Sequence, residues 1–344
     1  MSDSVRAVRT VAALASYGER LALATTLEDV FEASLTGIEE LLGFAHSLVL
    51  VHQPELGRLV TVASRGYESG GAGSEVALGE GLIGMVGARR QAMRIGNLQR
   101  MLSYARTVRR SEVDPSSHGD EIPLPGLPDA RSQLAAPMVA RGVLVGVLAV
   151  ESNVALAYDE LDEHALSVAA HLVAGAVERE ELVTSEADPP TPEATTAAPT
   201  AEPVAETGTR VTTPVLRHYA VDGSTFIDDG YVIKGVAGRL LWKVVSEHTA
   251  TGRTSFTNRE AKLDPMLELP EYRDNFESRL ILLKRRLEEH AAPVRIRSTG
   301  RGRFELELQP AISLEYISRW APGRHGQCRA ALRLCHVTAR RCAF

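Results

Sequence analysis

The chain has 344 residues, 44% of them hydrophobic, with a formal net charge of −6, which is enough sequence for about two domains of ~100–200 residues each. No segment reaches the ~18 uninterrupted apolar residues of a membrane span, and the opening residues MSDSVRAVRT lack the apolar block of a secretory signal. All three cysteines, Cys328, Cys335 and Cys342, lie near the C-terminus, so we expect no disulfide framework or thiol chemistry in the folded part. We therefore predict a cytoplasmic protein that does not contact membranes.

Charge is distributed unevenly along the chain. Residues 1–210 contain 16 Lys and Arg against 29 Asp and Glu, a balance of −13; residues 211–310 contain 16 against 14, a balance of +2; residues 311–344 contain 6 against 1, a balance of +5. This asymmetry predicts that the parts bind different partners and that the acidic part does not approach phosphate backbones.

The first predicted element is a helix over about 26–42, opened by a capping box of Thr25 and Glu28 and carrying one apolar stripe. Two antiparallel strands follow in AHSLVLVHQ and GRLVTVASRGY, and two more in SQLAAPMVARGVLVGVLAVES, where Arg141-Gly142 supplies the turn. A closing helix is predicted over about 158–184. This order of elements predicts an α+β domain over residues 1–184, with a sheet covered by helices.

Three segments of this first domain resemble GAF sensory domains: VALGEGLIGMVGARRQAMRIGNL, SQLAAPMVARGVLVGVLAVES and YDELDEHALSVAAHLVAGAVERE. The resemblance covers about 20–183. It implies a regulatory pocket between the sheet and the middle helices that binds a small ligand such as a cyclic nucleotide. It also implies a homodimer formed by the flanking helices at about 5–23 and 158–184. Members that attach tetrapyrroles or reduce sulfoxides use cysteines, which this domain lacks, and its ligand-binding residues and ligand stay unidentified.

Three features of the first domain have more than one interpretation. His46 and His52 lie on one face of a strand and could ligate metal or haem, but no third ligand has usable spacing, so we favour structural histidines. The glycines of GEGLIGMVG match neither nucleotide-binding fingerprint, and we expect them in tight turns. The proline-rich segment 111–133 is either a flexible lid beside the pocket or a disordered insertion.

Residues 185–214 are rich in Pro, Thr and Ala and lack large apolar side chains through most of their length. Such a segment cannot bury enough surface to offset its ordering entropy. We predict an extended, flexible linker.

A second domain is predicted over residues 215–310. Short strands joined at Asp222-Gly223 and Asp229-Gly230 precede a helix that ends at Gly252. A capping box of Thr257 and Glu260 opens a short second helix. The third helix lies within RDNFESRLILLKRRLEEH, and PVRIRSTGRGRFELEL forms a hairpin with arginines at its tip.

These elements resemble the winged-helix output domain of OmpR-type response regulators over about 220–309. The likeness is carried by FTNREAKL as second helix, SRLILLKRRLEE as recognition helix and VRIRSTGRGRFEL as wing. It implies binding of double-stranded DNA, with the third helix in the major groove and the wing in the adjacent groove. The residues carried over are Lys284 and Arg285 in the groove, Arg301 and Arg303 as wing contacts to phosphate, and Asn258 and Arg259 as contacts to the DNA backbone.

The recognition helix departs from the family pattern. Ile281 and Leu282 stand where the family usually has basic side chains, and we expect both to be exposed opposite the buried stripe of Phe276, Leu280, Leu283 and Leu287. Exposed aliphatic side chains more often mark protein contacts, and a balance of +2 is far from that of a strongly basic nucleic-acid binder. A protein partner at Ile281 and Leu282 is therefore the alternative to DNA.

Residues 311–344 are predicted to be a disordered basic tail that adds phosphate affinity, because cysteines seven residues apart do not match the close pairs of zinc sites. No nucleophile, base and orienter occur at readable spacing, so we predict no enzymatic activity, no metal site and no cofactor. The sequence thus predicts a ligand-responsive transcriptional regulator with a GAF-like sensor and a winged-helix output. The alternative is a signalling adaptor whose winged helix binds a protein.

Overall fold

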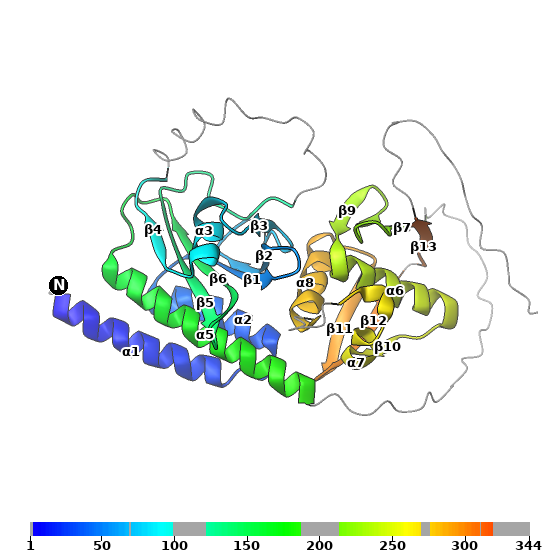
Figure 1. Cartoon of the computed structure of the whole chain (residues 1–344), viewed down its shortest axis with the longest axis horizontal. Helices are drawn as coiled ribbons and strands as arrows, with labels where there is room; N and C mark the ends of the chain where they lie inside the picture. Colours follow the sequence, from blue (N-terminus) through cyan, green and yellow to red (C-terminus); the bar gives the residue numbers. More distant parts are fainter. Residues whose placement is uncertain are drawn as a thin grey trace, which may run out of the picture.

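The computed structural model describes residues 3–68, 70–98, 122–186, 213–269, 276–309 and 311–318. We call residues 3–186 the N-terminal unit and residues 213–318 the C-terminal unit; they are drawn on the left and right of Figure 1. Residues 187–212 of the predicted linker, residues 111–121 of the predicted lid and residues 319–344, with all three cysteines, lie outside the described residues.

The N-terminal unit is built on a six-stranded antiparallel sheet with the order β3-β2-β1-β6-β5-β4. The turn between the two longest strands is the predicted one, because Arg141 and Gly142 both have positive φ (48° and 76°), as a two-residue type I′ hairpin requires. The strands are β1 (His46–Gln53), β2 (Arg58–Arg65), β3 (Glu75–Ala77), β4 (Met93–Ile95), β5 (Ser132–Ala140) and β6 (Val143–Ser152).

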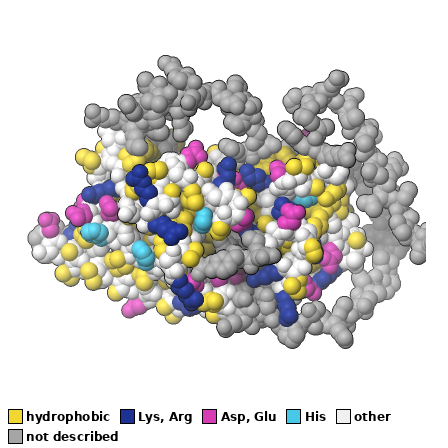
Figure 2. All heavy atoms as spheres, viewed as in Figure 1, with side chains coloured by type: hydrophobic (Ala, Val, Ile, Leu, Met, Phe, Trp, Pro, Cys, Tyr) yellow, Lys and Arg dark blue, Asp and Glu magenta, His cyan; other side chains and the backbone are white. Residues whose placement is uncertain are grey.

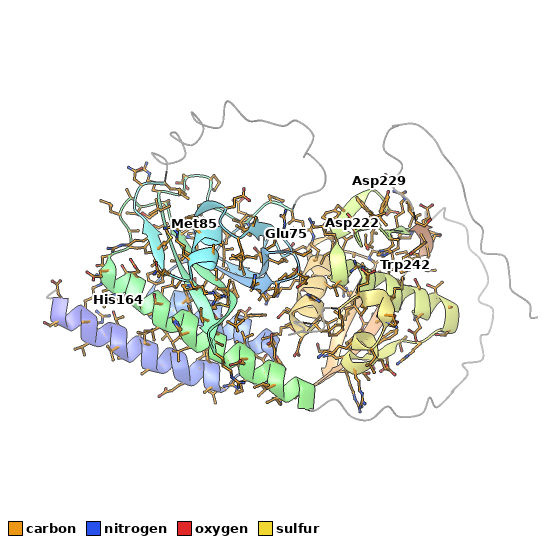
Figure 3. All side chains as sticks on the ribbon, in the orientation of Figure 1. Glu75, Met85, His164, Asp222, Asp229 and Trp242 are labelled. Carbon is orange, nitrogen blue, oxygen red and sulfur yellow. The ribbon has the colours of Figure 1, made fainter. Side chains whose placement is uncertain are left out.

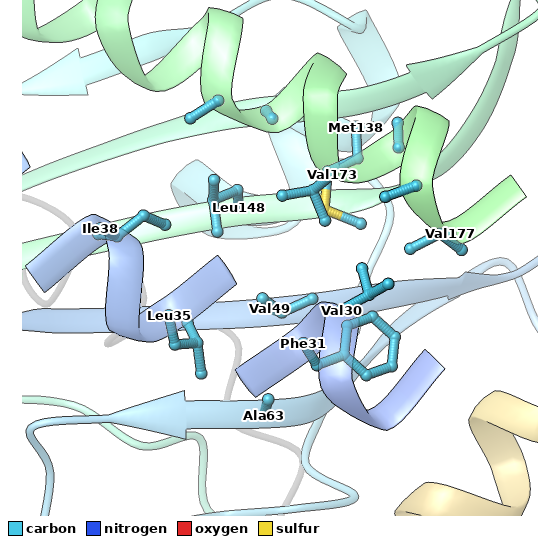
Figure 4. Close-up of a cluster of buried hydrophobic side chains, with 14 of the residues drawn as sticks. Val30, Phe31, Leu35, Ile38, Val49, Ala63, Met138, Leu148, Val173 and Val177 are labelled. Atoms are coloured by element: carbon cyan, nitrogen blue, oxygen red, sulfur yellow. The ribbon is translucent and has the colours of Figure 1, made fainter. Parts of the chain in front are cut away.

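Helices cover both faces of this sheet (Figure 1). Helices α1 (Asp3–Ala22), α2 (Leu27–Leu42) and α5 (Glu160–Glu186) form one layer, and α3 (Gly81–Arg89) lies on the opposite face. The larger core lies between the sheet and the three-helix layer. Figure 4 shows part of it, with side chains from α2, α5 and four strands, among them Val30, Phe31, Leu35, Ile38, Val49, Met138, Leu148 and Val173.

The capping box that opens α2 lies one residue later than predicted. Thr26, not Thr25, is the N-cap, and Asp29, not Glu28, is its partner: Asp29 N donates to Thr26 Oγ1 at 3.1 Å and Thr26 N donates to Asp29 Oδ2 at 3.0 Å. The pattern Thr-Thr-Leu-Glu-Asp offers two overlapping boxes, and the shorter Asp side chain closes the second one. Glu28 is thereby left with its side chain outside the cap.

The C-terminal unit contains two small sheets and three α-helices in its described part. The chain forms β7 (Val215–Tyr219), β8 (Thr225–Ile227), β9 (Gly230–Ile233), α6 (Gly235–Thr251), β10 (Ser255–Thr257), α7 (Asn258–Lys262), a 3₁₀ turn (Pro265–Leu267), α8 (Phe276–Glu289), β11 (Val294–Gly300), β12 (Arg303–Leu308) and β13 (Ser313–Ile317). The sheet orders are β13-β7-β8-β9 and β10-β12-β11. The predicted capping box of Thr257 and Glu260 is confirmed.

Strand β13 extends this unit beyond the predicted boundary at residue 310. It pairs in parallel with β7, from Ser313 beside Val215 to Ile317 beside Tyr219. The sequence prediction assigned these residues to a disordered tail, and for 313–317 it was wrong. A five-residue strand with two charged or polar positions has little pattern of its own, and its partner lies about a hundred residues earlier in the chain.

Two glycine positions test the helix packing of the N-terminal unit. Gly37 of α2 lies against Tyr17 of α1, and a Cβ at Gly37 would be 2.6 Å from the Tyr17 ring; nothing lies within 4 Å of a Cβ added at Gly175 in α5. We expect Gly37→Ala to lower the free energy of unfolding by about 1–3 kcal/mol, because the buried ring must move. Gly175→Ala should raise it by about 0.5–1 kcal/mol through helix propensity. Urea denaturation measures both, and equal effects of the two substitutions would contradict this packing.

Candidate functional site between the two units

Helix α8, the predicted recognition helix, lies between the two units. Its apolar stripe of Phe276, Leu280, Leu283 and Leu287 packs into the C-terminal core. Its outer face lies against the N-terminal unit, on the side of β1 and β2 (Figure 1). The predicted recognition surface is therefore covered by the same chain.

Ile281 and Leu282 are buried rather than exposed. Each is only 3% accessible. Ile281 packs into the hydrophobic cluster of the N-terminal unit. Leu282 lies against Gly73 of the same unit, because a Cβ added at Gly73 would be 3.7 Å from Leu282 Cδ1. The predicted exposure of these two residues was wrong, because an amphipathic pattern cannot show that a second unit covers the outer face. They contact protein, and that protein is the N-terminal unit.

Ion pairs connect the two units around this apolar centre. Lys284 pairs with Glu28 of α2, Arg279 with Glu55 in the β1–β2 turn, Lys234 with Glu75 at 3.1 Å, and Arg301 with Glu180 at 3.5 Å. Glu75 is labelled in Figure 3 on the side of the N-terminal unit that faces the C-terminal unit. In each of these four pairs among the described residues, the N-terminal unit supplies the carboxylate and the C-terminal unit the cation.

Two further hydrogen bonds join the units. The predicted wing residue Arg301 donates from Nη2 to the backbone oxygen of Thr25 at 2.9 Å, just before α2. In the opposite direction, Ala72 N donates to Glu289 Oε1 at 3.2 Å. The contact between the units therefore includes the C-terminal end of α8 and the tip of the β11–β12 hairpin.

The structure separates the predicted DNA-binding residues into two groups. Lys284 and Arg301 lie at the contact between the units. Arg259 and Arg303 are exposed, and Arg285 is half-buried. The Asn258 side chain is buried at the start of α7, where the Asn258 N–H donates to Gly302 O at 2.8 Å.

A buried polar cluster lies on the other side of the N-terminal sheet, the side opposite the three-helix layer. Glu151 Oε1 accepts from Gln133 Nε2 at 2.9 Å, and Glu151 Oε2 accepts from Leu127 N at 3.1 Å and from Tyr67 Oη at 3.4 Å. The His46 ring contacts the Tyr67 ring with centroids 5.6 Å apart. Burial raises the pKa of Glu151, and burial with the charge of Glu151 raises the pKa of Tyr67. Sequence reasoning missed Glu151, which lies next to the last residue of an apolar strand and belongs to no motif.

A short loop connects this polar cluster to α8. We call residues 70–74 the glycine loop and residues 122–127, which include Leu127, the strap. A Cβ at Gly71, whose φ is +57°, would lie 2.3 Å from Pro125 Cγ of the strap. On its other side the glycine loop meets α8 through the hydrogen bond from Ala72 to Glu289. A displacement of the strap would therefore reach α8 through one loop.

The charge state of Glu151 should be visible in stability. Because its pKa is raised in the folded protein, the folded state binds the proton more tightly, and wild-type stability falls as pH rises above the ordinary glutamate pKa. Glu151→Gln lacks this loss, so the variant should gain stability relative to wild type between pH 4 and pH 7. Urea denaturation at both pH values measures it, with the exposed Glu68→Gln as control. A stability of the variant relative to wild type that is unchanged or lower at pH 7 than at pH 4 would contradict the raised pKa of Glu151.

Comparison with known proteins identifies the N-terminal unit. Residues 24–178 match the model of the GAF domain family. None of the curated proteins matches the chain. Within the described residues, no helix is long and apolar enough to cross a membrane.

Solved structures that resemble the chain cover about half of it. The GAF domain of a phosphoenolpyruvate-protein phosphotransferase from Coxiella burnetii is 19% identical, with 52% of this chain and 98% of that chain covered and a TM-score of 0.41. A counterpart from Acinetobacter is 21% identical, with 53% and 98% covered and a TM-score of 0.40. A free methionine-R-sulfoxide reductase from Neisseria meningitidis is 18% identical, with 53% and 95% covered and a TM-score of 0.41. The assignment rests on the family match: residues 24–178 match the GAF domain family, whose members are small-ligand-binding modules of sensory and signalling proteins.

Proposed function

We propose that this protein is a ligand-responsive transcription regulator, in which the GAF domain senses a small molecule and the C-terminal unit binds double-stranded DNA as a winged helix. The observation that carries the proposal is the arrangement of α8 and the β11–β12 hairpin, whose cations Lys284 and Arg301 both face the same neighbouring surface. A helix and a hairpin presented together match how winged helices contact a major groove and its neighbour. The proposal includes no enzymatic activity.

Electrostatics supports an anionic partner. Arg295, Arg297 and Arg303 are exposed on the hairpin, and Arg297 pairs with Glu307 at 3.0 Å. On the face viewed in Figure 2, Lys and Arg side chains are interspersed with acidic and apolar ones. Part of the positive charge of the C-terminal unit is neutralised by the N-terminal unit in this arrangement.

The polar cluster and the strap support a ligand site in the GAF domain. A buried carboxylate with a raised pKa and a nearby tyrosine is a common feature of functional sites. A ligand that hydrogen-bonds Glu151 would compete with Leu127 of the strap. The glycine loop then offers a short route from that site to α8.

The alternative function is that of an adaptor whose α8 binds a protein partner. It is favoured by one observation, the pair Ile281 and Leu282, which already form an apolar contact with protein surface. Protein contacts of this kind depend little on salt, whereas contacts to phosphate release counterions and depend on it strongly.

Arg303 offers a direct test of DNA binding. We expect the full chain to bind duplex DNA with an affinity that falls steeply with salt. Arg303→Ala should weaken binding to every sequence and lower the slope of log K against log salt by about 1. The control is Arg89→Ala, an exposed arginine on α3 of the N-terminal unit. Fluorescence anisotropy over a salt series measures the slope. A flat slope that Arg303→Ala leaves unchanged would favour the adaptor.

We also propose a homodimer formed by the helix layer of the N-terminal unit. Val5, Val8 and Val11 of α1 are exposed, as are Val168 and Leu172 of α5. Helices α1 and α5 pack against each other, and Leu172 lies beside Gly18. An apolar surface on two long helices suits a second copy, and two C-terminal units on one duplex would gain avidity.

Light scattering tests the dimer. The wild-type protein should have twice the chain mass of 37.2 kDa. Val8→Asp with Val11→Asp should give monomers by placing charge in the apolar contact. Val154→Asp, at an exposed valine outside these helices, is the control. A wild-type monomer at high micromolar concentration would contradict the proposal.

A further inference from the structure

We propose that the N-terminal unit acts as an intramolecular competitor: its carboxylates occupy a polyanion-binding surface formed by α8 and the β11–β12 hairpin, so that this surface binds its partner only after the units separate. The identification of the polyanion as DNA rests on the proposed function. The competition itself rests on the contact between the units, which we call the closed arrangement.

The polarity of the closed arrangement is the first support. Glu28, Glu55 and Glu180 reach across from three separate elements, α2, the β1–β2 turn and α5. Each meets a cation on α8 or at the hairpin tip. The N-terminal unit thus presents spaced negative charges to the surface that a phosphate backbone would contact, which matches the acidic balance of residues 1–210.

The burial of the cations is the second support. The side chains of Arg279 and Lys284 are only 3% and 10% accessible. A charge removed from water to this extent depends on an opposite charge nearby. The pairs with Glu55 and Glu28 are therefore part of what holds α8 in place, and loss of these carboxylates weakens the contact.

The geometry of α8 makes the two contacts mutually exclusive. A recognition helix reads the groove through its outer face, and in the closed arrangement Ile281, Leu282 and Lys284 of that face are all buried. Arg301 of the hairpin is bonded to Thr25 and Glu180 as well. The measured association constant for a polyanion is then the intrinsic constant multiplied by the fraction of molecules in which the two units have separated.

The main test variant changes only the N-terminal unit of the full chain. Glu28→Lys with Glu55→Lys reverses two carboxylates that face α8 and leaves every residue of the C-terminal unit unchanged. Both side chains are partly exposed, 41% and 25%, so we expect the N-terminal unit to stay folded with both substitutions. The matched control is Glu32→Lys with Glu40→Lys, which adds the same charge on α2. The partners of Glu32 and Glu40 are Arg65 and Arg20 of the same unit.

Two readouts are taken: the radius of gyration from small-angle X-ray scattering without DNA, and the affinity for a random-sequence duplex. We expect the test variant to expand and to bind the duplex at least about tenfold more tightly than the control at equal salt. Glu28→Lys combined with Lys284→Glu, which restores an ion pair in the opposite sense, should return the radius toward that of wild type.

The outcomes separate the two proposals. If the test variant is as compact as its control and binds the duplex with equal affinity, the competition is overturned. The proposed DNA binding still stands in that case, provided that the wild-type protein binds the duplex. Expansion without any gain in duplex affinity would overturn the assignment of this surface to a polyanion, and with it the proposed DNA-binding function. Expansion with tighter binding supports both.

Discussion

The burial of helix α8 between two hydrophobic cores is the interaction on which the arrangement of this protein depends. One face of the helix completes the C-terminal unit through Phe276, Leu283 and Leu287, and the other contributes Ile281 to the cluster of the GAF domain. Burying one aliphatic side chain of this size contributes about 1.5–3 kcal/mol. The exposed ion pairs around this centre add little, whereas Arg279 is almost fully buried, so loss of its partner Glu55 would leave an uncompensated buried charge. Apolar contact supplies most of the attraction, and charge fixes the orientation.

The proposed coupling of ligand sensing to output involves only a few contacts. The polar cluster around Glu151 holds the strap, the strap packs on the glycine loop, and the glycine loop meets α8. Coupling between two sites needs an element with two arrangements, and the ligand of each site must bind one arrangement more tightly than the other. The contact between the units is that element in our account. The free energy of this contact has to be modest, because a ligand shifts the equilibrium between the two arrangements only by the difference in its affinity for them.

Local features of the fold were predictable because their signals are local. The Arg141-Gly142 turn and the capping box of Thr257 and Glu260 follow from neighbouring residues and are confirmed. The capping box of α2 was misplaced by one residue because two overlapping boxes compete there. Strand β13 was missed because its pairing with β7 joins segments far apart in the sequence.

The candidate site was less predictable. Lys284 and Arg301 were identified from a resemblance, but their carboxylate partners on the GAF domain were not, since no pattern within α8 distinguishes water from a second protein surface. Two signals were present: the aliphatic pair Ile281 and Leu282 on a face expected to be polar, and the opposite charge balances of the two units. Read together, an apolar patch within a basic surface and an acidic neighbour in the same chain indicate an internal contact.

The central claim is that the GAF domain and a polyanion exclude one another from α8. The most direct measurement is the distance between spin labels at Glu68 and Asp229, both exposed and on different units, in a chain whose three cysteines are replaced by serine. The account predicts one narrow distance without DNA and a longer, broader distribution with saturating duplex. An unchanged narrow distance on molecules fully bound to duplex would contradict it.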